Sequence, residues 1–572
     1  MTASFRLLRD PVLAVGLLVA AGFVAGAILL PLWAMLGESL SEQGRPLFRR
    51  YLTEPVFQAI ALNTVVMGLV VATVGTALGL LFAFVQVKLA GPTALKRLIH
   101  LAALVPIISP PFAVATAVIV LFGRNGLITR GLFGVRYDVY GLTGLTLVLS
   151  LSFFTVAYLN LRGMLEALDP SLEEASTNLG ADRWRTFRTV TLPLLVPGLA
   201  GSFLLLFVEA IADLSNPLVI GGNYEVLATR IYVSVIGLYD TTAAAVLSVV
   251  LLVPALTVFL VQRYWVSRAS VVSITGKPAG TPQLIDHPLV VWPLFALALL
   301  VVLLIALIYG TILAGSVTEL FGINYAPTLR HFATVLTGFG ARALTDTATL
   351  AALATPVTAV LGMLIAYLVM RTRLAGRAAL DFATMLGIAV PGTVLGIGYL
   401  LTFNDPITLR LPFLAEPVTL VPKLNGGRAV LGGALAIVVV YVVRSVPAAL
   451  RSGAAALAQI DPAIEEASTS LGAGSVRTFR RITLPLIRPA FLVSLIYAFA
   501  RSMTTLSAVI FLTTPQTRIM TQQILNEVEQ GRYGNAFALC VILIGVVSAA
   551  IGTLYVLVGS TGGAARTPPV AQ

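Results

Sequence analysis

Two stretches of the chain carry nearly the same polar sequence: EEASTNLGADRWRTFRTVTLP at residues 173–193 and EEASTSLGAGSVRTFRRITLP at residues 465–485. Their starts lie 292 residues apart, since 465 minus 173 is 292. Each stretch lies between long apolar segments, and a polar, arginine-bearing segment of this length is too costly to place in hydrocarbon. We therefore expect two water-exposed loops, and their repetition indicates a common use, the binding of a partner protein.

The composition around these loops is that of an integral membrane protein. Of 572 residues, 58% are hydrophobic and only 11% are charged, which is far from the balance of soluble domains. Twelve apolar runs approach the ~20 residues that cross a bilayer as helix, and the repeated loops follow the fourth and the tenth. The runs lie near residues 12–36, 64–87, 98–122, 141–161, 199–220, 242–264, 289–313, 347–370, 379–403, 429–446, 490–512 and 535–558.

The first run and the single cysteine each exclude one alternative. The run is too long for the apolar core of a cleavable signal peptide, so we expect it to be retained as the first span. Cys540 lies inside the last run and has no second cysteine with which to form an intramolecular disulfide.

The chain divides into two like halves of six spans each. We expect a first repeat at 1–266 with its loop at 169–193, a cytoplasmic linker at 267–288, and a second repeat at 289–572 with its loop at 461–485. An even number of spans per half gives both halves the same orientation, so the repeat is parallel. The expected fold is an all-α integral membrane protein whose pathway lies between two parallel six-helix repeats.

The basic residues predict the orientation of the chain. Lys and Arg number 37 against 25 Asp and Glu. A cytoplasmic amino terminus places the larger share of the cations on the cytoplasmic side, as the positive-inside rule requires. Both termini and both repeated loops are then cytoplasmic, and the basic balance needs no nucleic acid to explain it.

Each loop is expected to fold as two short helices joined by a turn. Asp169 and Asp461 each precede a proline and are placed to cap the first helix. Gly180 and Gly472 follow that helix, at the position where a glycine ends a helix in the left-handed conformation.

Two further features of the loops follow from residue spacing. Apolar residues at i, i+3 and i+7 give each first helix a narrow stripe that a groove on a partner would fit. Pro193 and Pro485 are expected to break the second helix before the next span. The stripes consist of Leu172, Ala175 and Leu179 in the first loop, and of Ile464, Ala467 and Leu471 in the second.

Both loops resemble the EAA motif of permease subunits of binding-protein-dependent ABC importers. The matching positions are Glu174, Ala175, Gly180, Leu192 and Pro193 in the first loop, and Glu466, Ala467, Gly472, Leu484 and Pro485 in the second. Ser176 and Ser468 replace the second alanine of the motif, and Val190 replaces an isoleucine. The repeat and the span count extend the resemblance over almost the whole chain, which is similar to the fused, ferric-iron type of permease.

The resemblance implies a type I ABC importer permease fold and a coupling role for the loops. The residues implied in coupling to the ATPase are Glu173, Glu174, Ala175, Gly180, Glu465, Glu466, Ala467 and Gly472. The implied partners are two ATP-binding cassette subunits inside, an external or periplasmic solute-binding protein, and the lipid of a bacterial cytoplasmic (inner) membrane. The implied substrate is ferric iron, with aminoethylphosphonate, sulfate, thiamine or a polyamine as alternatives.

The chain carries no nucleotide-binding loop of its own. Gly276 and Lys277 are followed by Pro278 and lack the first glycine of a Gly-x-x-x-x-Gly-Lys-Ser/Thr sequence. ATP hydrolysis is therefore expected from a separate chain, and this one is expected to be a non-catalytic transport subunit without a cofactor.

Glu209, Asp213 and Arg501 fall inside the fifth and eleventh apolar runs and are candidates for the pathway or its gate. Glu209 and Asp213 lie about one turn apart in the fifth run, and Arg501 is the repeat counterpart of Glu209, since 209 plus 292 is 501. We hypothesise that Glu209 and Arg501 meet and hold the pathway shut, which leaves Asp213 as an unpaired acid near the route. A purely structural pair, or two residues each satisfied within its own half, is the alternative.

Two other classes of protein compete with this interpretation. A twelve-span secondary transporter shares the parallel plan, but the segment after the second run, VKLAGPTALKR, lacks the Gly-x-x-x-Asp-Arg-like pattern of that class, and the two loops stay unexplained. A membrane-embedded enzyme lacks a cluster of catalytic side chains. A histidine metal site is not expected, because the histidines stand far apart at His100, His287 and His331.

Overall fold

The computed structural model describes residues 11–265, 284–372, 374–410, 417–426 and 429–561. Most of the expected linker, 267–283, lies outside the described residues. The chain forms two compact units, which we call unit A and unit B and describe separately. Unit A comprises Glu42–Val335 and Ile524–Val541, and unit B comprises Met1–Ser41, Leu336–Gln523 and Ile542–Gln572.

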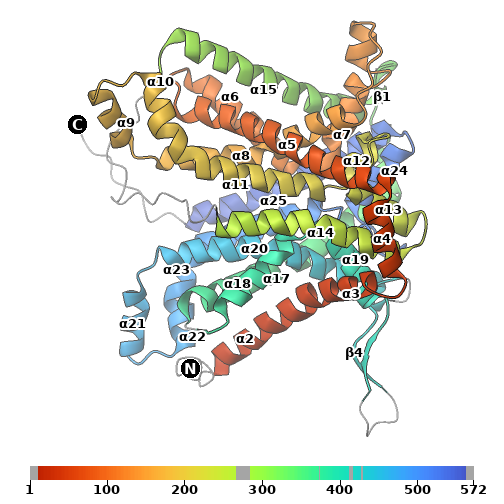
Figure 1. Ribbon diagram of the computed structural model, residues 1–572, viewed down its shortest axis with the longest axis vertical. Coiled ribbons are helices and arrows are strands. Elements are labelled where there is room, and N and C mark those ends of the chain that lie inside the picture. The colour runs from red at the N-terminus through yellow and green to blue at the C-terminus, as the bar shows by residue number, and fades with distance from the viewer. Residues whose placement is uncertain (1–10, 266–283, 373, 411–416, 427–428, 562–572) are drawn as a thin grey trace. The chain divides into compact units, whose positions relative to one another are not determined.

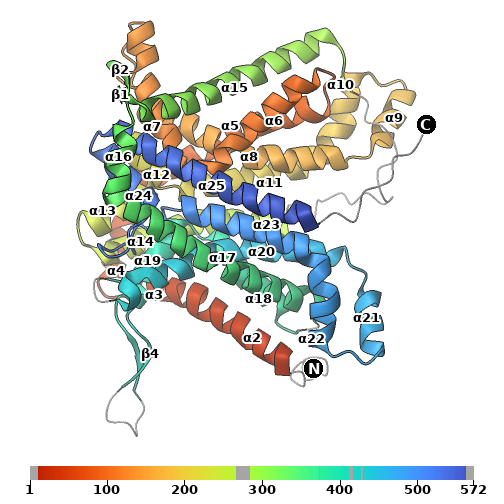
Figure 2. The same ribbon diagram turned by 180° about the vertical axis from the view of Figure 1, so that it is seen from behind.

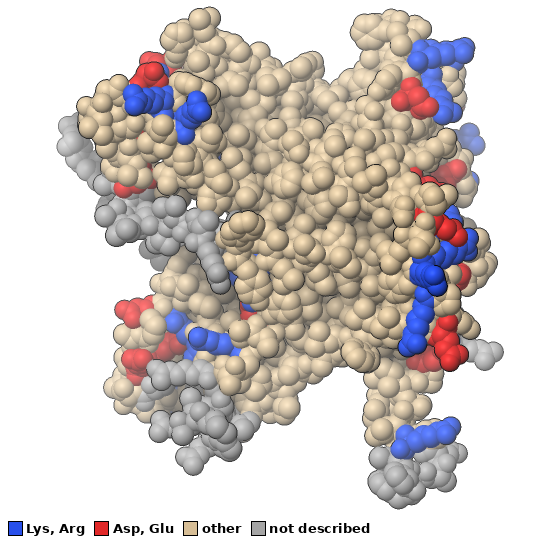
Figure 3. All heavy atoms as spheres, viewed as in Figure 1, with Lys and Arg blue, Asp and Glu red and all other residues tan. Residues whose placement is uncertain are grey.

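The described residues contain the expected number of membrane spans. Eleven helices are long and apolar enough to cross a membrane, and a twelfth span results if a bent helix pair in unit B is counted as one. On the face drawn in Figure 3, charged side chains gather toward the two ends of the helices, and the surface between them is almost free of charge. The prediction of a multi-pass, largely helical membrane protein is confirmed.

Unit A is built on three long helices that pack side by side, α5, α8 and α11, with α15 against α5, α6 and α7 (Figure 1). Phe82 of α5 packs edge-on against Phe154 of α8, with ring centroids 5.1 Å apart. The helices of unit A are α4 (Gly44–Thr53), α5 (Pro55–Val87), α6 (Thr93–Ile108), α7 (Pro111–Phe122), α8 (Leu142–Ala167), α9 (Pro170–Asn178), α10 (Arg183–Thr186), α11 (Leu192–Ala212), α12 (Ser215–Ile220), α13 (Leu227–Ile236), α14 (Thr241–Tyr264) and α15 (Pro288–Ser316).

Unit B repeats this core with α17, α20 and α23 (Figure 2). A Cβ atom at Gly79 in unit A or at Gly362 in unit B would overlap Ala157 or Ala449, so each glycine lets two spans approach closely. The helices of unit B are α2 (Pro11–Phe23), α3 (Leu30–Ser39), α17 (Phe339–Arg371), α18 (Arg377–Ala389), α19 (Gly392–Phe403), α20 (Ala434–Ala458), α21 (Pro462–Ser470), α22 (Ser475–Thr478) and α23 (Leu484–Thr504). Three helices are divided between the units: α16 (Arg330–Thr337), α24 (Met520–Glu529) and α25 (Tyr533–Thr561).

Each unit takes the first span of the opposite half of the chain. In unit B, α2 and α3 pack with α17 and α19, and the hydroxyl of Tyr399 donates to the backbone oxygen of Ala27 at 2.6 Å. In unit A, α15 packs with α5, α6 and α7, and the hydroxyls of Tyr309 and Ser109 lie 2.6 Å apart. The compact units are therefore not the two halves in chain order.

Two expected spans, 98–122 and 379–403, are each broken into two helices. The first divides at Ser109 into α6 and α7, and the second divides at Val390 into α18 and α19 with a bend of 104°. Both breaks precede a proline, Pro110 or Pro391, because the residue before a proline is driven out of the helical conformation. Neither run forms the single helix that its length predicted.

A buried arginine satisfies the backbone at the break in unit B. Arg444 of α20 is almost fully buried and donates through Nη1 to the backbone oxygens of Val390 and Gly387, at 2.9 and 3.3 Å. Carbonyls at the end of a broken helix have lost their helical partners, and unsatisfied groups inside a membrane cost several kcal/mol. Arg444 therefore satisfies carbonyls at the end of α18, beside the bend.

Two spans end earlier than expected, and two hairpins were not expected at all. The runs 199–220 and 490–512 leave the helix at Ala212 and Thr504. Beyond the ends of the spans lie two antiparallel hairpins, one in each unit. Their strands are β1 (Thr318–Leu320) with β2 (Asn324–Pro327) in unit A, and β3 (Ile407–Leu409) with β4 (Val418–Val421) in unit B.

Candidate functional site

The first repeated loop folds as two short helices at the end of α8 and α11 (Figure 1). Asp169 precedes α9, and its carboxylate accepts the backbone N–H of Ser171 at 3.0 Å. Gly180 follows with φ of +85°, a conformation that L side chains rarely adopt. The side chain of Asp182 then caps α10 by accepting the backbone N–H of Arg185 at 2.7 Å.

The second loop repeats this design at the end of α20 and α23 (Figure 2). The carboxylate of Asp461 accepts the backbone N–H of Ala463 at 2.9 Å at the start of α21. Gly472 has φ of +83° and leads into α22. The caps and helix-ending glycines predicted from the sequence are confirmed in both loops.

The predicted break at Pro193 and Pro485 is wrong. In each loop the second short helix continues into the span through one turn of π-helix, Phe187–Thr191 or Phe479–Thr483. Residues Arg183–Ala212 thus form one continuous helix. A proline removes one helical donor and crowds the preceding turn, and the wider π turn just before it accommodates both effects.

A buried ion pair anchors the first loop to unit A. Lys88, directly after the end of α5, donates through Nζ to both carboxylate oxygens of Glu173, at 2.7 and 2.8 Å. The hydroxyl of Thr191 donates to the same carboxylate at 2.7 Å. The side chains of Lys88 and Glu173 are only 7% and 12% exposed, so Glu173 faces its own unit rather than solvent.

The second loop is anchored to unit B by a longer ion pair at the equivalent glutamate. Nε of Arg371, at the end of α17, lies 3.5 Å from the carboxylate of Glu465. The hydroxyl of Thr483 donates to Glu465 at 2.8 Å. Arg371 also donates to the backbone oxygens of Leu457 and Ile460, at 2.9 and 2.8 Å, which ties the end of α20 to the same cation.

The serines that depart from the EAA pattern join the two short helices of each loop. The hydroxyls of Ser176 and Thr186 lie 3.0 Å apart, and those of Ser468 and Thr478 lie 2.8 Å apart. An alanine at either serine position has no group to make this hydrogen bond. The serine in place of the second alanine of the motif therefore stiffens each loop.

The apolar stripe of each first helix is exposed. Leu179 and Leu471 are both 89% exposed, and Ala175 and Ala467 lie on the surface as well. Large apolar side chains exposed at equivalent points of both loops are typical of a protein-binding surface. The stripes are completed by the exposed side chains of Leu172 and Ile464.

The remaining predicted coupling residues lie at the surface or near it. Glu174 is half-buried and Glu466 is exposed. Sequence reasoning missed the anchoring cations Lys88 and Arg371. The available signal was a cation shortly before a Leu-Ala-Gly triplet that occurs in both halves, at 89–91 and 374–376.

The segment that enters α15 contacts the first loop. The backbone N–H of Ile285 donates to the oxygen of Lys88, and that of Ala90 donates to Ile285, both at 2.8 Å. Next to it, Arg183 of α10 forms an ion pair with Asp286. The hydrogen bond from Arg183 lowers the pKa of the Asp286 carboxyl below its usual value.

The candidate gate residues are distributed over both units. Glu209 lies in α11 of unit A and Arg501 in α23 of unit B, each half-buried. Asp213 is buried and accepts both the backbone N–H and the side-chain Nδ2 of Asn216, at 2.9 Å each. Asp213 therefore caps the turn between α11 and α12, and its role beside the pathway stays a prediction.

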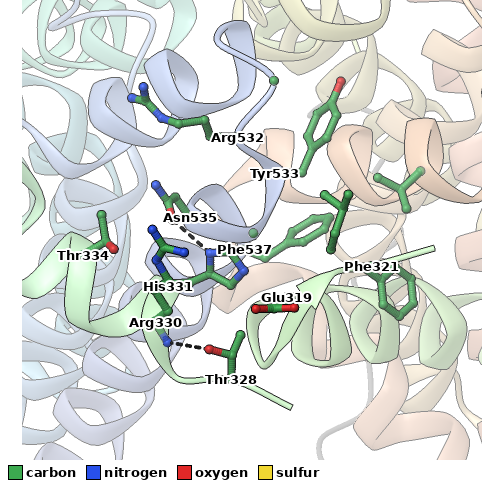
Figure 4. Close-up of a pocket in the computed structure, with 14 residues that line it drawn as sticks. Glu319, Phe321, Thr328, Arg330, His331, Thr334, Arg532, Tyr533, Asn535 and Phe537 are labelled. Atoms are coloured by element: carbon green, nitrogen blue, oxygen red, sulfur yellow. Dashed lines mark hydrogen bonds between the residues drawn. The ribbon is translucent and has the colours of Figure 1, made fainter. Parts of the chain in front are cut away.

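A hollow of about 420 Å³ lies at the opposite end of unit A, beside β1, α16 and the start of α25 (Figure 4). There His331 bonds the side chain of Asn535 at 3.0 Å and the backbone oxygen of Thr318 at 2.9 Å. Asn535 in turn donates to Glu527, which Arg532 also contacts at 2.6 Å. The lining of the hollow carries charges of both signs, from Glu319, Arg330 and Arg532.

No group of three or more His, Cys, Asp or Glu side chains that could hold a metal ion is found among the described residues. The three histidines stand apart in the fold. His100 bonds Tyr158 inside unit A, His287 precedes α15, and His331 lines the hollow described above.

Comparison with known proteins identifies the family. A model of the binding-protein-dependent transport system inner membrane component matches residues 75–271 and again 358–560. The chain is 38% identical over 511 residues to the ferric transport system permease protein FbpB of Actinobacillus pleuropneumoniae, covering 86% of this chain and 70% of the relative. A Haemophilus influenzae protein assigned to the same group, FbpB 1, is 36% identical over 490 residues, 82% and 72% of the two chains.

A more distant relative matches a length of this chain close to that of one repeat. The molybdenum transport system permease protein ModB of Escherichia coli is 29% identical over 231 residues, which is 38% of this chain and 96% of ModB. A protein of about half the length thus corresponds to one repeat. The chain belongs to the family of inner membrane components of binding-protein-dependent transport systems and contains that family's unit twice.

Proposed function

We propose that this chain forms the transmembrane pathway of an ATP-driven importer and receives work from separate ATPase subunits through its two EAA loops. One observation carries the proposal: each loop has an exposed apolar stripe on one side and a buried ion pair to its own unit on the other. An ATPase subunit that binds the stripe therefore moves a loop that is fixed to the ends of α5 and α8 in unit A, or to the ends of α17 and α20 in unit B. Two loops of one design call for two ATPase subunits.

We assign different roles to the residues of the loops. Leu172, Ala175 and Leu179, with their counterparts in the second loop, enter the ATPase surface, and Glu174 and Glu466 flank that contact. Glu173 and Glu465 transmit the motion inward through Lys88 and Arg371. Gly180 and Gly472 set the angle between the two short helices, because another residue would be strained at their positive φ.

An association experiment tests the docking surface. Replacing Leu179 and Leu471 together by Asp places a charge in the middle of each contact, and we expect co-purification of the ATPase to fall by at least tenfold. Ile323→Asp is the matched control, because Ile323 is also largely exposed, at 80%, but lies beyond the far end of α15. Unchanged association of the double variant, or an equal loss with Ile323→Asp, contradicts the assignment.

The same proposal gives an orientation. The EAA loops and both termini lie in the cytoplasm, and the hollow at the opposite end of unit A faces the external solute-binding protein. Cys540 is the only cysteine and is buried, so the background of thiol labelling is low. We expect a membrane-impermeant maleimide to label Ile323→Cys from outside and Leu179→Cys only after the membrane is opened.

We propose ferric iron as the substrate, because the relatives matched over most of the chain carry that name. Matches to molybdenum and sulfate permeases cover less of this chain, and these anions are the alternatives. Reconstituted vesicles given the cognate binding protein loaded in turn with ferric iron, molybdate or sulfate decide among them. Uptake of an anion without uptake of iron overturns the assignment.

The charged residues of the fifth and eleventh spans complete the proposal. Glu209 and Arg501 close the pathway between the two repeats, 1–266 and 289–572. Asp213 supports them by fixing the turn that ends α11, through its two hydrogen bonds to Asn216.

A further inference from the structure

An apolar groove of about 650 Å³ lies in unit A beside the first EAA loop. Its volume is in the range of sites that hold small molecules. One wall comes from α5, one from α15 and the floor from the loop itself. The principal lining side chains are Ala77, Leu81, Phe84, Trp184, Phe187 and Leu294.

Aromatic rings shape the end of the groove nearest the loop. Phe187 packs edge-on against Phe84 and is stacked with Trp184, with centroid distances of 5.6 and 5.8 Å. Trp184 remains 67% exposed. A tryptophan so placed at the end of a span is typical of the headgroup level of a membrane, where an apolar ring and a polar N–H are both satisfied.

The groove changes character along its length. From His287 to Leu294 it follows α15 for seven residues, about 10 Å at the rise of a helix. Its deep part is lined by alkyl side chains of two membrane spans. Its rim carries Asp182, Arg183 and His287, the polar residues at the ends of these elements.

We propose that this groove binds one acyl chain of a membrane phospholipid, with the phosphate at the rim formed by Arg183 and Trp184. Both walls are membrane spans, so the groove opens at the depth where acyl chains lie. Leu297 and Leu300 continue the same apolar surface along α15 and are themselves exposed. A phosphate accepts hydrogen bonds from a guanidinium and from an indole N–H. Arg183 donates to Asp286 through Nη1, so the N–H groups on its other nitrogens remain for the phosphate.

The bound chain has a structural consequence for the first loop. It contacts α5, α15 and the loop at once, and so buries Trp184 and the exposed side of Phe187. The first EAA loop is then held by lipid in addition to the Glu173–Lys88 pair. This site does not depend on the identity of the substrate or of the ATPase.

Fluorescence quenching of Trp184 tests the proposal. The variant with Trp33, Trp265 and Trp292 all replaced by Phe retains Trp184 as the only tryptophan. We expect phosphatidylglycerol with brominated acyl chains, added to the detergent-purified full chain, to quench Trp184 saturably. Ala77→Phe fills the deep part of the groove and is expected to raise the half-saturating lipid concentration at least fivefold.

Val360→Phe is the matched control. Val360 occupies the corresponding place on α17, because Gly79 and Gly362 are counterparts and both pairs of positions lie 283 residues apart. It is exposed but does not line this groove. Quenching that rises linearly without saturation, or that is unaffected by Ala77→Phe, overturns the proposal.

Two further measurements exclude other occupants and misfolding. If the groove binds the ATPase or the chain's own linker instead of lipid, brominated lipid fails to quench Trp184 in the intact full chain. That result overturns the proposal. Should Ala77→Phe elute as an aggregate on gel filtration, Leu294→Phe narrows the groove from the opposite wall and replaces it. Equal lipid affinity of a monodisperse Leu294→Phe variant likewise overturns the proposal.

Discussion

Glu173→Gln isolates the link between the first EAA loop and its unit. The substitution keeps the size of the side chain and removes the charge that faces Lys88 at 2.7 Å. Breaking a buried pair by neutralising one partner costs about 3–5 kcal/mol, because the other charge stays buried and uncompensated. The pair lies at the end of a span and Glu173 retains 12% exposure, so we expect the lower limit, about 3 kcal/mol.

Hydrogen exchange measures this cost where it arises. Local detachment of the loop exposes the amides of α9, and a loss of about 3 kcal/mol corresponds to roughly 100-fold faster exchange. Mass spectrometry of the peptide that covers 170–191 reads this rate directly. Exchange in the peptide that covers α21 of unit B is expected to stay as in the unmodified chain.

Two further variants separate the effect of breaking the buried ion pair from the effect of losing a carboxylate in general. Glu174→Gln makes the same chemical change on the neighbouring residue, which has no ion pair to lose among the described residues, and is expected to exchange at the normal rate. Lys88→Met combined with Glu173→Gln removes both charges and is expected to recover most of the protection. If Glu173→Gln alone leaves the exchange of α9 unchanged, the ion pair does not hold the loop.

Three other outcomes are expected. Arg444→Met removes the hydrogen-bond donor of the carbonyls at the helix break, which costs about 1–3 kcal/mol for each carbonyl left unsatisfied. We expect thermal inactivation in detergent at a lower temperature, and Arg444→Lys should recover part of the lost stability. The pKa of Asp286 is lowered in the folded chain. Its pair with Arg183 therefore stabilises the contact between the first loop and the segment before α15 fully above the usual Asp pKa near 4, and this stabilisation is lost as pH falls through the lower folded pKa. Exchange protection of the Ile285 amide should fall over the same pH range, and Asp286→Asn should abolish that pH dependence. Combined Glu209→Gln and Arg501→Gln should leak substrate or uncouple ATP hydrolysis if the two close the pathway, and normal coupled uptake argues for a purely structural role.

Local chemistry made the loops predictable. In each loop an aspartate before a proline and a glycine eleven residues after the aspartate mark the two ends of a short helix. Both signals act within a few residues, and the structure places α9 and α21 accordingly. The span count was also accessible, because twenty apolar residues identify a membrane helix by length alone. These features depend on the sequence around them and on nothing distant.

Features that depend on distant partners were not predictable. The breaks near Pro110 and Pro391 had a local signal, but Pro106, Pro254 and Pro447 lie inside continuous helices. Proline alone therefore does not decide where a membrane helix ends. What distinguishes the break at Val390 is Arg444, 54 residues away in the sequence and 2.9 Å away in space.

The anchoring pairs show why the two loops are alike and their supports are not. Glu173 and Glu465 hold the same place in the repeat, yet one meets a lysine and the other an arginine, and only the arginine also binds two backbone oxygens of the preceding span. A point charge such as lysine tolerates small changes of angle, whereas a guanidinium fixes several donors in one plane. The second loop is therefore tied through Arg371 to the end of α20, whereas the first loop is tied through Lys88 and Arg183 to the segment that enters α15, and the proposed lipid adds to that support.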